Sequence, residues 1–144
     1  MKLESRMAHI SICIPCYNEE GNILELHRRL DAVLNQMSYH SFSIVFGDNS
    51  STDNTVGLIK DLISRDERIG LVLNRTNFGF VRSSANILLT PNADANIFLM
   101  ADLQDPPELI LNLVREWEQG EYDVIFGSRV SSHENRILFT IKRV

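Results

Sequence analysis

Hydrophobic residues recur along the chain with two different spacings, and each spacing predicts a different kind of element. Five short runs rich in β-branched and aromatic residues are typical of strands. They cover residues 9–14, 41–47, 69–73, 96–100 and 123–126. Between these runs, apolar residues recur at every third or fourth position, which is typical of a helix with one buried side. The predicted helices cover residues 22–37, a stretch through Val56, Ile59 and Ile63, residues 79–89, and about 107–118.

The alternation of strands and helices predicts the fold class. Strand–helix–strand units at this spacing form a mostly parallel sheet with right-handed crossovers, and the helices then cover both faces of the sheet. We therefore expect an α/β protein with three layers, helix on sheet on helix, of the Rossmann-like kind. Gly120 is placed to end the last helix, because glycine readily adopts the left-handed conformation that follows many helices.

Polar residues follow each predicted strand. An open parallel sheet binds ligands at the edge where its strands end. A single polar loop is ordinary in any protein, but five on one edge, with carboxylates, amides and an arginine among them, suit a polar ligand. The residues, in strand order, are Tyr17, Asn18 and Glu19; Asp48 and Asn49; Asn77; Asp102; and Ser128 and Arg129.

The stretch FLMADLQDPPE, residues 98–108, is where we expect the chemistry to centre. Its apolar run has the length of a strand and stops at Asp102, Gln104 and Asp105, which would bring oxygen ligands to the carboxyl edge of the sheet. The double proline that follows suits the first turn of a helix, where a backbone N–H is not needed. The stretch therefore predicts a strand, an acidic loop and a helix.

Composition and charge narrow the class of protein. The chain has 144 residues, 44% of them hydrophobic and 23% charged, which suits one globular domain over residues 1–144. Its apolar runs are much shorter than the roughly 18 to 20 residues of a spanning helix, and its first residues lack the pattern of a signal peptide, so we expect a cytoplasmic location. The net charge of -5 argues against a nucleic-acid partner. It is compatible with an anionic substrate if a divalent metal supplies positive charge locally.

Four strings of the sequence together resemble a known family. They are SICIPCYNEEGNI, FGDNSSTDNT, NRTNFGFVRSSA, and ADLQDPPELI followed by DVIFGSR. In this order and spacing they resemble the family 2 glycosyltransferases of the GT-A fold, and among these the polyprenyl-phosphate glycosyltransferases related to dolichol-phosphate mannose synthase. The similarity runs from Ile10 to Arg129.

The resemblance implies an enzyme of cell-envelope polysaccharide synthesis. Such an enzyme is an inverting transferase that moves a sugar from a UDP- or GDP-sugar to an acceptor. A polyprenyl phosphate is the expected acceptor and a saccharide is the other one. The residues implied in nucleotide binding are Pro15, Tyr17, Glu19, Asp48, Asn49 and Asp102.

The resemblance also implies a metal and two catalytic residues. Asp102 and Gln104 match the ligands of Mg²⁺ or Mn²⁺, which would bridge the donor diphosphate, and oxygen ligands suit either ion. Arg129 matches an arginine associated with the phosphates at the reaction centre, where a guanidinium fork is apt. Asp102 and Arg129 are accordingly the expected catalytic residues.

The sequence departs from the family pattern at two places. Met100 stands where the Asp-x-Asp motif has its first carboxylate, although Asp105 is near enough to help through water. Relatives also continue past Val144 into an acceptor-binding half and, in many, membrane helices, so we expect membrane association through that part only. The tail ENRILFTIKRV suits either a basic helix at a membrane surface or a frayed terminal helix packed on the domain. A sheet that lacks the acceptor half would expose an apolar face and favour a homo-oligomer.

Three other functions compete with this interpretation. A dinucleotide-dependent oxidoreductase would need a glycine-rich turn after the first strand, where this chain has Pro15. A non-catalytic relative that only binds nucleotide fits the replacement at Met100. Cys13 and Cys16 have the spacing of a redox pair, but Cys13 lies inside a predicted strand and no helix begins directly at the pair, so two reduced thiols are the simpler interpretation.

Overall fold

The computed structural model describes residues 7–127 and 141–142. Residues Met7–Pro107 form one compact unit, and the described residues from Glu108 onward belong to a second unit. The two units are described separately below. One nucleotide-sugar-binding domain over residues 1–144 stays a prediction.

The larger unit is built on a four-stranded parallel sheet. Its strands are β1 (His9–Cys16), β2 (Ser41–Asp48), β3 (Ile69–Leu73) and β4 (Ala95–Phe98), and they lie in the order β3-β2-β1-β4. β1 and β2 are the central strands, and seven of the eight residues of β1 are buried. A central parallel strand is covered on both faces, which explains the nearly continuous apolar sequence of β1. The predicted parallel α/β sheet is confirmed.

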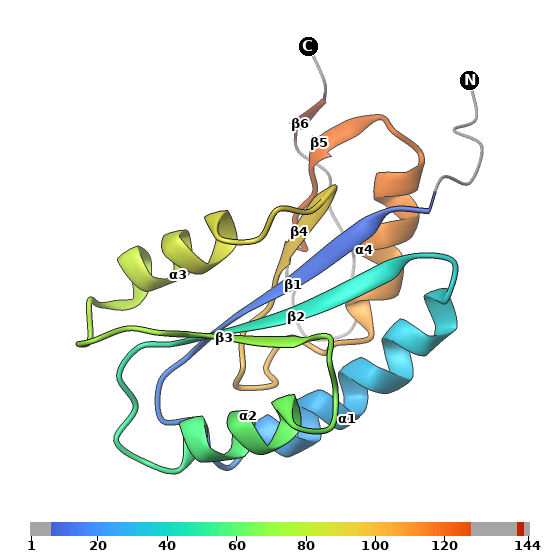
Figure 1. The fold of residues 1–144 in the computed structure, drawn as a ribbon. Coiled ribbons are helices and arrows are strands. Elements are labelled where there is room, and N and C mark those ends of the chain that lie inside the picture. The colour runs from blue at the N-terminus through green and yellow to red at the C-terminus, as the bar shows by residue number, and fades with distance from the viewer. Residues whose placement is uncertain (1–6, 128–140, 143–144) are drawn as a thin grey trace. The chain divides into compact units, whose positions relative to one another are not determined.

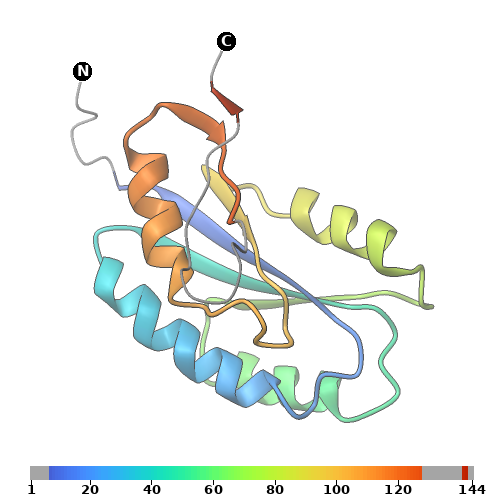
Figure 2. The ribbon, with the colours of Figure 1, turned by 180° about the vertical axis from the view of Figure 1, so that it is seen from behind.

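Helices cover both faces of this sheet. They are α1 (Ile23–Leu34), which continues into the 3₁₀ helix η1 (Asn35–Met37), α2 (Thr55–Ile63) and α3 (Phe80–Leu89). Figure 1 shows α1 and α2 on one face and α3 on the other, and the view from behind in Figure 2 shows the same arrangement. The predicted three layers are therefore present in this unit.

The bounds of some elements differ from the predicted ones. The helix predicted over residues 22–37 ends at Leu34, and its last turn tightens into η1. β4 ends at Phe98 rather than at residue 100, although the Leu99 N–H still donates to Cys13 O at 3.1 Å. Asn54 occupies the cap position of α2 without a side-chain hydrogen bond, and the Thr55 N–H at the start of the helix is bound by Asp53 Oδ1 at 3.0 Å.

α1 is held to the sheet by an apolar face and to the α2–β3 turn by charged groups. Its buried residues are Ile23, Leu26, Leu30, Val33 and Leu34. Arg68 in the turn contacts Asp66 at 2.6 Å and Asp31 of α1 at 2.7 Å, and His27 of α1 lies 3.1 Å from Asp66. Hydrogen bonding from the Arg68 side chain holds the pKa of Asp66 well below its usual range. These four side chains therefore tie two elements together far from the carboxyl edge of the sheet.

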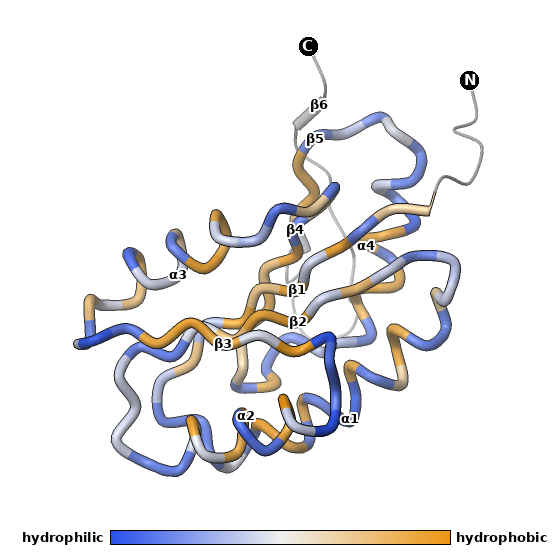
Figure 3. The backbone as a smooth tube through the Cα atoms, viewed as in Figure 1, coloured by the Kyte–Doolittle hydropathy of each residue, from blue (hydrophilic) through white to orange (hydrophobic). Residues whose placement is uncertain are grey.

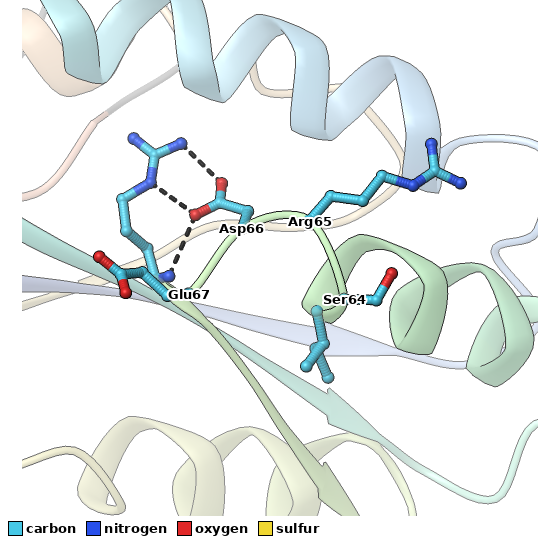
Figure 4. Close-up of a pocket in the computed structure, with 6 residues that line it drawn as sticks. Ser64, Arg65, Asp66 and Glu67 are labelled. Atoms are coloured by element: carbon cyan, nitrogen blue, oxygen red, sulfur yellow. Dashed lines mark hydrogen bonds and ion pairs between the residues drawn. The ribbon is translucent and has the colours of Figure 1, made fainter.

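A surface pocket lies at the same turn. It is lined by residues 63–68, and Figure 4 shows Asp66 among them, with the hydrogen bonds to its carboxylate drawn as dashed lines. β3 begins directly after these residues, so the pocket adjoins the amino end of β3. The carboxyl edge, where the sequence predicts the ligand, is at the other end of the strands.

α3 packs on the opposite face through a small contact. Its buried residues are Ser83 and Ile87. Gly47 of β2 makes the close approach possible, because a Cβ atom there would lie 3.0–3.1 Å from side-chain atoms of Ile87.

The second unit contains α4 (Leu109–Glu118), β5 (Tyr122–Val124) and β6 (Ile141–Lys142). α4 begins two residues later than predicted, with Glu108 at its cap position. It ends as expected near Gly120, which has a φ of 70° and donates its N–H to Trp117 O at 2.9 Å.

The fifth predicted strand does not join the parallel sheet. β5 covers residues 122–124 rather than 123–126, and it pairs antiparallel with β6. Its residues are half-buried or exposed, so it lacks the burial that favours the central strands. In the predicted terminal helix, Ile141–Lys142 is a strand, and residues 134–140 and 143–144 lie outside the described residues. Among the helices that the structure describes, none combines the length and the apolar character needed to cross a bilayer.

Candidate functional site

The predicted site residues of the larger unit lie where three neighbouring strands end. β1 and β2 are in register, with Cys16 opposite Asp48, so the loops that follow both strands begin at the same level. β4 lies on the other side of β1, with Phe98 opposite Cys13, and leads toward Asp102. The topology therefore brings the three polar loops to one edge.

Asp48 is the most deeply buried carboxylate at this edge. The residue is 2% exposed, and its Oδ2 accepts a hydrogen bond from the Ser51 N–H at 3.0 Å. Its Oδ1 has no hydrogen-bond partner among the described residues. A buried acceptor without a donor is costly and rare, so this oxygen is the clearest sign that the edge is built to receive a donor group from a ligand.

Cys16 lies close to this carboxylate. Burial raises the pKa of its thiol, and the negative charges of Asp48 and Glu19 raise the pKa further. Burial also raises the pKa of Cys13. Both are buried free thiols, and neither has the lowered pKa that a reactive redox pair requires.

The loops after β1 and β2 are joined by reciprocal hydrogen bonds. Asn18 has a φ of 52°, donates its N–H to Ser51 Oγ at 2.9 Å, and accepts the Thr52 N–H on its Oδ1 at 2.8 Å. A second reciprocal pair lies beside it, with the Glu20 N–H on Asp53 Oδ2 at 3.1 Å and the Asn54 N–H on Glu20 Oε2 at 2.8 Å. The two loops therefore form one rigid wall of the site.

This wall carries the residues expected to contact a base. Tyr17 is 47% exposed, so its ring face is accessible. Glu19 is half-buried, its N–H donates to Thr55 Oγ1 at 2.8 Å, and its Oε2 accepts from Asn22 Nδ2 at 2.7 Å. Pro15 lies inside β1, buried and paired with Gly47. Tyr17 and Glu19 thus follow β1 directly after Cys16, the residue paired with Asp48, on a loop that is bonded to the loop after β2.

Asn49 uses its side chain inside the protein. Its Oδ1 accepts the Phe78 N–H at 3.0 Å and Asn74 Nδ2 at 3.1 Å, and its Nδ2 donates to Asn77 Oδ1 at 2.9 Å. Both lone pairs of the oxygen are therefore occupied. The side chain of Asn49 therefore holds the loop between β3 and α3 in place. Its contact with a nucleotide stays a prediction.

The acidic loop has one carboxylate in a suitable place for a metal. Asp102 is half-buried, and its Oδ1 accepts the Gln104 N–H at 3.0 Å. Between them Leu103 has a φ of 60°, a conformation that is rare for a residue with a branched side chain. Gln104 is exposed, and Met100 is half-buried. Within residues 7–127, no group of three or more histidine, cysteine or carboxylate side chains could enclose a metal ion.

Two site predictions fall outside what the structure describes. Arg129, the expected phosphate-binding arginine, and the neighbouring Ser128 lie outside the described residues. Ser51, Thr52 and Asp53 join the two loops and were not among the predicted site residues. The dense run of hydroxyl and carboxylate residues at 50–55 was the available signal, since such side chains often bond to nearby backbone N–H groups.

Comparison with known proteins gives a consistent result. The family model described as glycosyl transferase family 2 matches residues 11–142. An uncharacterized glycosyltransferase of Bacillus subtilis, YkcC, is 32% identical over 125 residues, which cover 87% of this chain and 38% of that protein. An undecaprenyl-phosphate 4-deoxy-4-formamido-L-arabinose transferase of Pseudomonas fluorescens is 38% identical over 118 residues, which cover 81% of this chain and 34% of that protein. The chain thus spans less than two fifths of the length of these relatives.

Solved structures agree at the level of the fold. The mannosyltransferase PcManGT from Pyrobaculum calidifontis, in complex with GDP-Man and Mn²⁺, matches with a TM-score of 0.64 and 18% identity, covering 77% of this chain and 32% of that one. S. aureus TarS in complex with UDP matches with a TM-score of 0.50 and 22% identity, covering 65% of this chain and 27% of that one. The shared fold is the GT-A fold of nucleotide-sugar transferases. Because the family model extends over nearly the whole chain and the relatives agree with it, this chain belongs to glycosyl transferase family 2.

Proposed function

We propose that this chain is the donor-binding part of an inverting, metal-dependent glycosyltransferase. The transferase takes a sugar from a UDP- or GDP-sugar and transfers it to a polyprenyl phosphate. A relative named as an undecaprenyl-phosphate sugar transferase supports this acceptor class. Neighbours of the same fold that were solved with GDP-Man and with UDP support the donor class.

The unpartnered oxygen of Asp48 is the observation that carries the proposal. Asp48 Oδ1 is buried at the carboxyl edge without a hydrogen-bond donor from the described residues. A base N–H or a ribose hydroxyl is a donor of the right kind for this oxygen. Tyr17, which is exposed, offers a ring face to the base, and Glu19 stands on the same loop. These three residues therefore bind the nucleoside part of the donor.

The residues of the acidic loop fit a divalent cation that is held in part by the substrate. Asp102 accepts one backbone hydrogen bond through Oδ1, which leaves Oδ2 available, and Gln104 adds an exposed amide oxygen. Mg²⁺ and Mn²⁺ are commonly bound by one or two carboxylates together with phosphates and water, so the Met100 replacement still leaves a usable site. When bound, the cation neutralises charge on the departing diphosphate. Asp102 and Gln104 hold and orient it.

The transfer step itself requires no general base from the described residues. An oxygen of the acceptor phosphate forms a bond to the anomeric carbon, the bond from that carbon to the donor phosphate oxygen breaks, and the nucleoside diphosphate leaves with the electron pair. A phosphate acceptor is already an anionic nucleophile, so no general base is required for this step. Arg129 is proposed to bind the phosphates at the reaction centre.

A second candidate function is nucleotide binding without transfer. Met100 in place of the first carboxylate of the metal motif favours it. This candidate predicts nucleotide binding and no release of sugar to any acceptor.

The test is calorimetric titration of the chain with UDP, GDP and UDP-glucose, each with Mn²⁺ and again with EDTA. We expect binding that requires the metal, at least tenfold weaker affinity in Asp48→Asn, roughly 1.4 kcal/mol, and loss of the metal-dependent binding in Asp102→Ala. Asp61→Asn is the matched control, because Asp61 is an exposed carboxylate on α2 outside the site. It should bind as the parent chain does.

Two results would count against the proposal. One is no binding of any nucleotide by a sample whose circular dichroism shows that it is folded. The other is equal affinity in the parent chain and in Asp48→Asn. Transfer to polyprenyl phosphate then separates the two candidate functions, because the non-catalytic relative would bind donor and release only unreacted nucleotide sugar.

A further inference from the structure

β3 forms one edge of the parallel sheet of the larger unit. Among the described residues it pairs with β2 alone. At the end of this ladder the Asn74 N–H donates to Asp48 O at 2.9 Å. Successive residues of a strand direct their backbone groups to alternate sides, so the even-numbered residues of β3 bond to β2 and the odd-numbered ones face away from it. Leu71 and Leu73 therefore present their backbone N–H and C=O groups at an open edge.

The sequence of β3 lacks the features that keep an exposed edge from pairing. Its five residues, Ile-Gly-Leu-Val-Leu, include no charged residue and no proline. Charged side chains and prolines are common means by which an edge strand avoids a partner. Leu73 is 52% exposed and Leu71 is half-buried, and Figure 3 shows β3 as a largely hydrophobic segment between hydrophilic ones. The strand is therefore suited to accept another strand.

Two residues of opposite charge flank this edge. Glu67 lies two residues before β3 and Arg75 lies two residues after it, so each is four residues from Leu71 at the centre of the strand. Both side chains are exposed. Neither side chain has an ion pair or a hydrogen bond within the described part of the chain. The two charges are thus placed symmetrically about Leu71 and are opposite in sign.

We propose that β3 pairs antiparallel with β3 of a second copy of this chain, about a two-fold axis at Leu71. Ile69 of each copy then lies opposite Leu73 of the other. By the same register, Glu67 of each copy lies opposite Arg75 of the other. Opposite charges at facing positions stabilise an antiparallel pair, whereas a parallel pair would place Glu67 beside Glu67. The charge pattern therefore selects a second copy in the antiparallel orientation.

The backbone groups at the edge fit the same register. In an antiparallel pair, two facing residues exchange both of their N–H···O bonds. The two Leu71 residues make this exchange with each other, and the Leu73 N–H of each copy donates to Ile69 O of the other. The Ile69 N–H takes no part, because it already donates to Asp66 O at 3.2 Å. One short strand from each copy makes a small contact, so we expect a weak dimer that dissociates on dilution.

The pairing brings two loops of different copies together. Antiparallel strands place the start of the loop after β3 of one copy beside residues 63–68, which line the surface pocket, of the other. Asn49 holds this loop through Asn74 and Phe78. The dimer itself does not depend on the proposed transferase activity, because it requires neither nucleotide nor metal.

The experiment is sedimentation velocity of the chain over a range of concentrations, at low and high salt. We expect a dimer that forms as the concentration rises and is weakened by salt. Glu67→Arg and Arg75→Glu each turn both attractive facing pairs into repulsive ones, so each should raise the dissociation constant at least about tenfold. An equimolar mixture of the two variants should restore the dimer, because the facing charges of the mixed dimer are again opposite.

Amide hydrogen exchange then locates the contact. The N–H groups of Gly70 and Val72 face β2, so they should be protected at every concentration. The N–H groups of Leu71 and Leu73 face the open edge and should become protected only as the dimer forms. A dimer through any other surface would leave these two amides unchanged.

Charge reversals on α1 are the matched controls. Glu25 and Arg28 are exposed on this helix, and Glu25→Arg and Arg28→Glu make the same two chemical changes outside the edge strand. Both variants should dimerise as the parent chain does. All substitutions are at exposed positions, and circular dichroism confirms that each variant is folded.

Several outcomes would overturn the proposal. One is a chain that stays monomeric up to about 1 mM, where even a weak dimer should form. Another is a dimer in which the Leu71 and Leu73 amides exchange as fast as in the monomer. A mixture of Glu67→Arg and Arg75→Glu that fails to dimerise, or an equal loss of affinity in the α1 variants, would also contradict the antiparallel register.

Discussion

The two helical layers of the larger unit differ in the residues that they expose to water. α1 buries a continuous apolar stripe, and its outer side carries charged residues such as the Glu25–Arg28 pair, whose atoms are 2.7 Å apart. α3 buries only Ser83 and Ile87 and leaves Val81 and Leu89 exposed. An amphipathic helix with a polar outer side is the usual arrangement in a soluble protein. The α1 helix therefore buries more apolar residues against the sheet than α3 does.

This difference suggests that the two layers contribute unequally to stability. The α1 layer is also tied to the start of β3 by Asp31, Asp66 and Arg68. The α3 layer is tied instead to the carboxyl edge, where Asn74 Nδ2 lies 3.2 Å from Ser83 Oγ and 3.1 Å from Asn49 Oδ1. Substitutions on the two helices should consequently have unequal effects on the free energy of unfolding.

The largest expected effect comes from the core of α1. Leu30 is fully buried, so Leu30→Ala should lower the free energy of unfolding by about 2–5 kcal/mol through lost burial and a cavity. Leu89→Ala on α3 makes the same chemical change at an 81% exposed site and should stay within about 0.5 kcal/mol. Urea unfolding of both variants measures the difference. Similar losses in the two would show that the layers contribute equally to stability.

A smaller effect is expected from adding a methyl group at Gly47, between β2 and α3. A methyl group at Gly47 would lie 3.0–3.1 Å from Ile87, so Gly47→Ala should cost about 1–3 kcal/mol by overpacking. Ile87→Ala removes two of the three contacting atoms, Cγ1 and Cδ1, so Gly47→Ala should cost less in the Ile87→Ala background, as thermal unfolding of the single and double variants would reveal. If the double variant is as unstable as the sum of the single ones, the contact between the two residues is not the cause.

The smallest expected effect concerns Asp66. Asp66→Asn keeps the shape of the side chain and removes its charge, so it should lower stability at neutral pH by about 1–2 kcal/mol. Because the folded-state pKa of Asp66 is depressed, its contribution is fully present above the unfolded carboxyl pKa of about 3.9 and is lost as the pH falls through the folded value. The gap between the parent chain and the variant should therefore narrow below about pH 4.

The matched substitution for Asp66→Asn is on the other layer. Arg82→Gln on α3 also removes one charge, but Arg82 has no ion pair among the described residues, so stability should change by less than about 0.5 kcal/mol at any pH in the series. Urea unfolding from about pH 7 down to about pH 2.5 compares both variants with the parent chain. If the difference in the free energy of unfolding between the parent chain and Asp66→Asn stays constant with pH, the charge of Asp66 does not contribute to the stability of the α1 layer.

The location of the candidate site was predictable from the sequence, but the roles of its residues were predictable only in part. Asp48 and Asp102 follow apolar runs, and the order of strands and helices brings both to one edge of the sheet. The hydrogen bonds that Asn49 makes to the loop after β3 were not predictable, because its partners Asn74 and Phe78 are 25 and 29 residues away. Nothing local in the sequence distinguishes an amide that faces a ligand from one that closes a loop.

The sequence by itself determined the elements of this protein and its family. Strands and helices are local, and their periodic burial leaves a pattern that can be recognised in one chain, as the exact agreement of β3 with the predicted residues 69–73 illustrates. Tertiary structure decided the rest. It turned the predicted fifth strand into a partner of β6, joined Asn18 to Thr52 across 34 residues, and left Val81 and Leu89 on the outer side of α3. These features depend on which distant residues meet, and neither spacing nor composition records that.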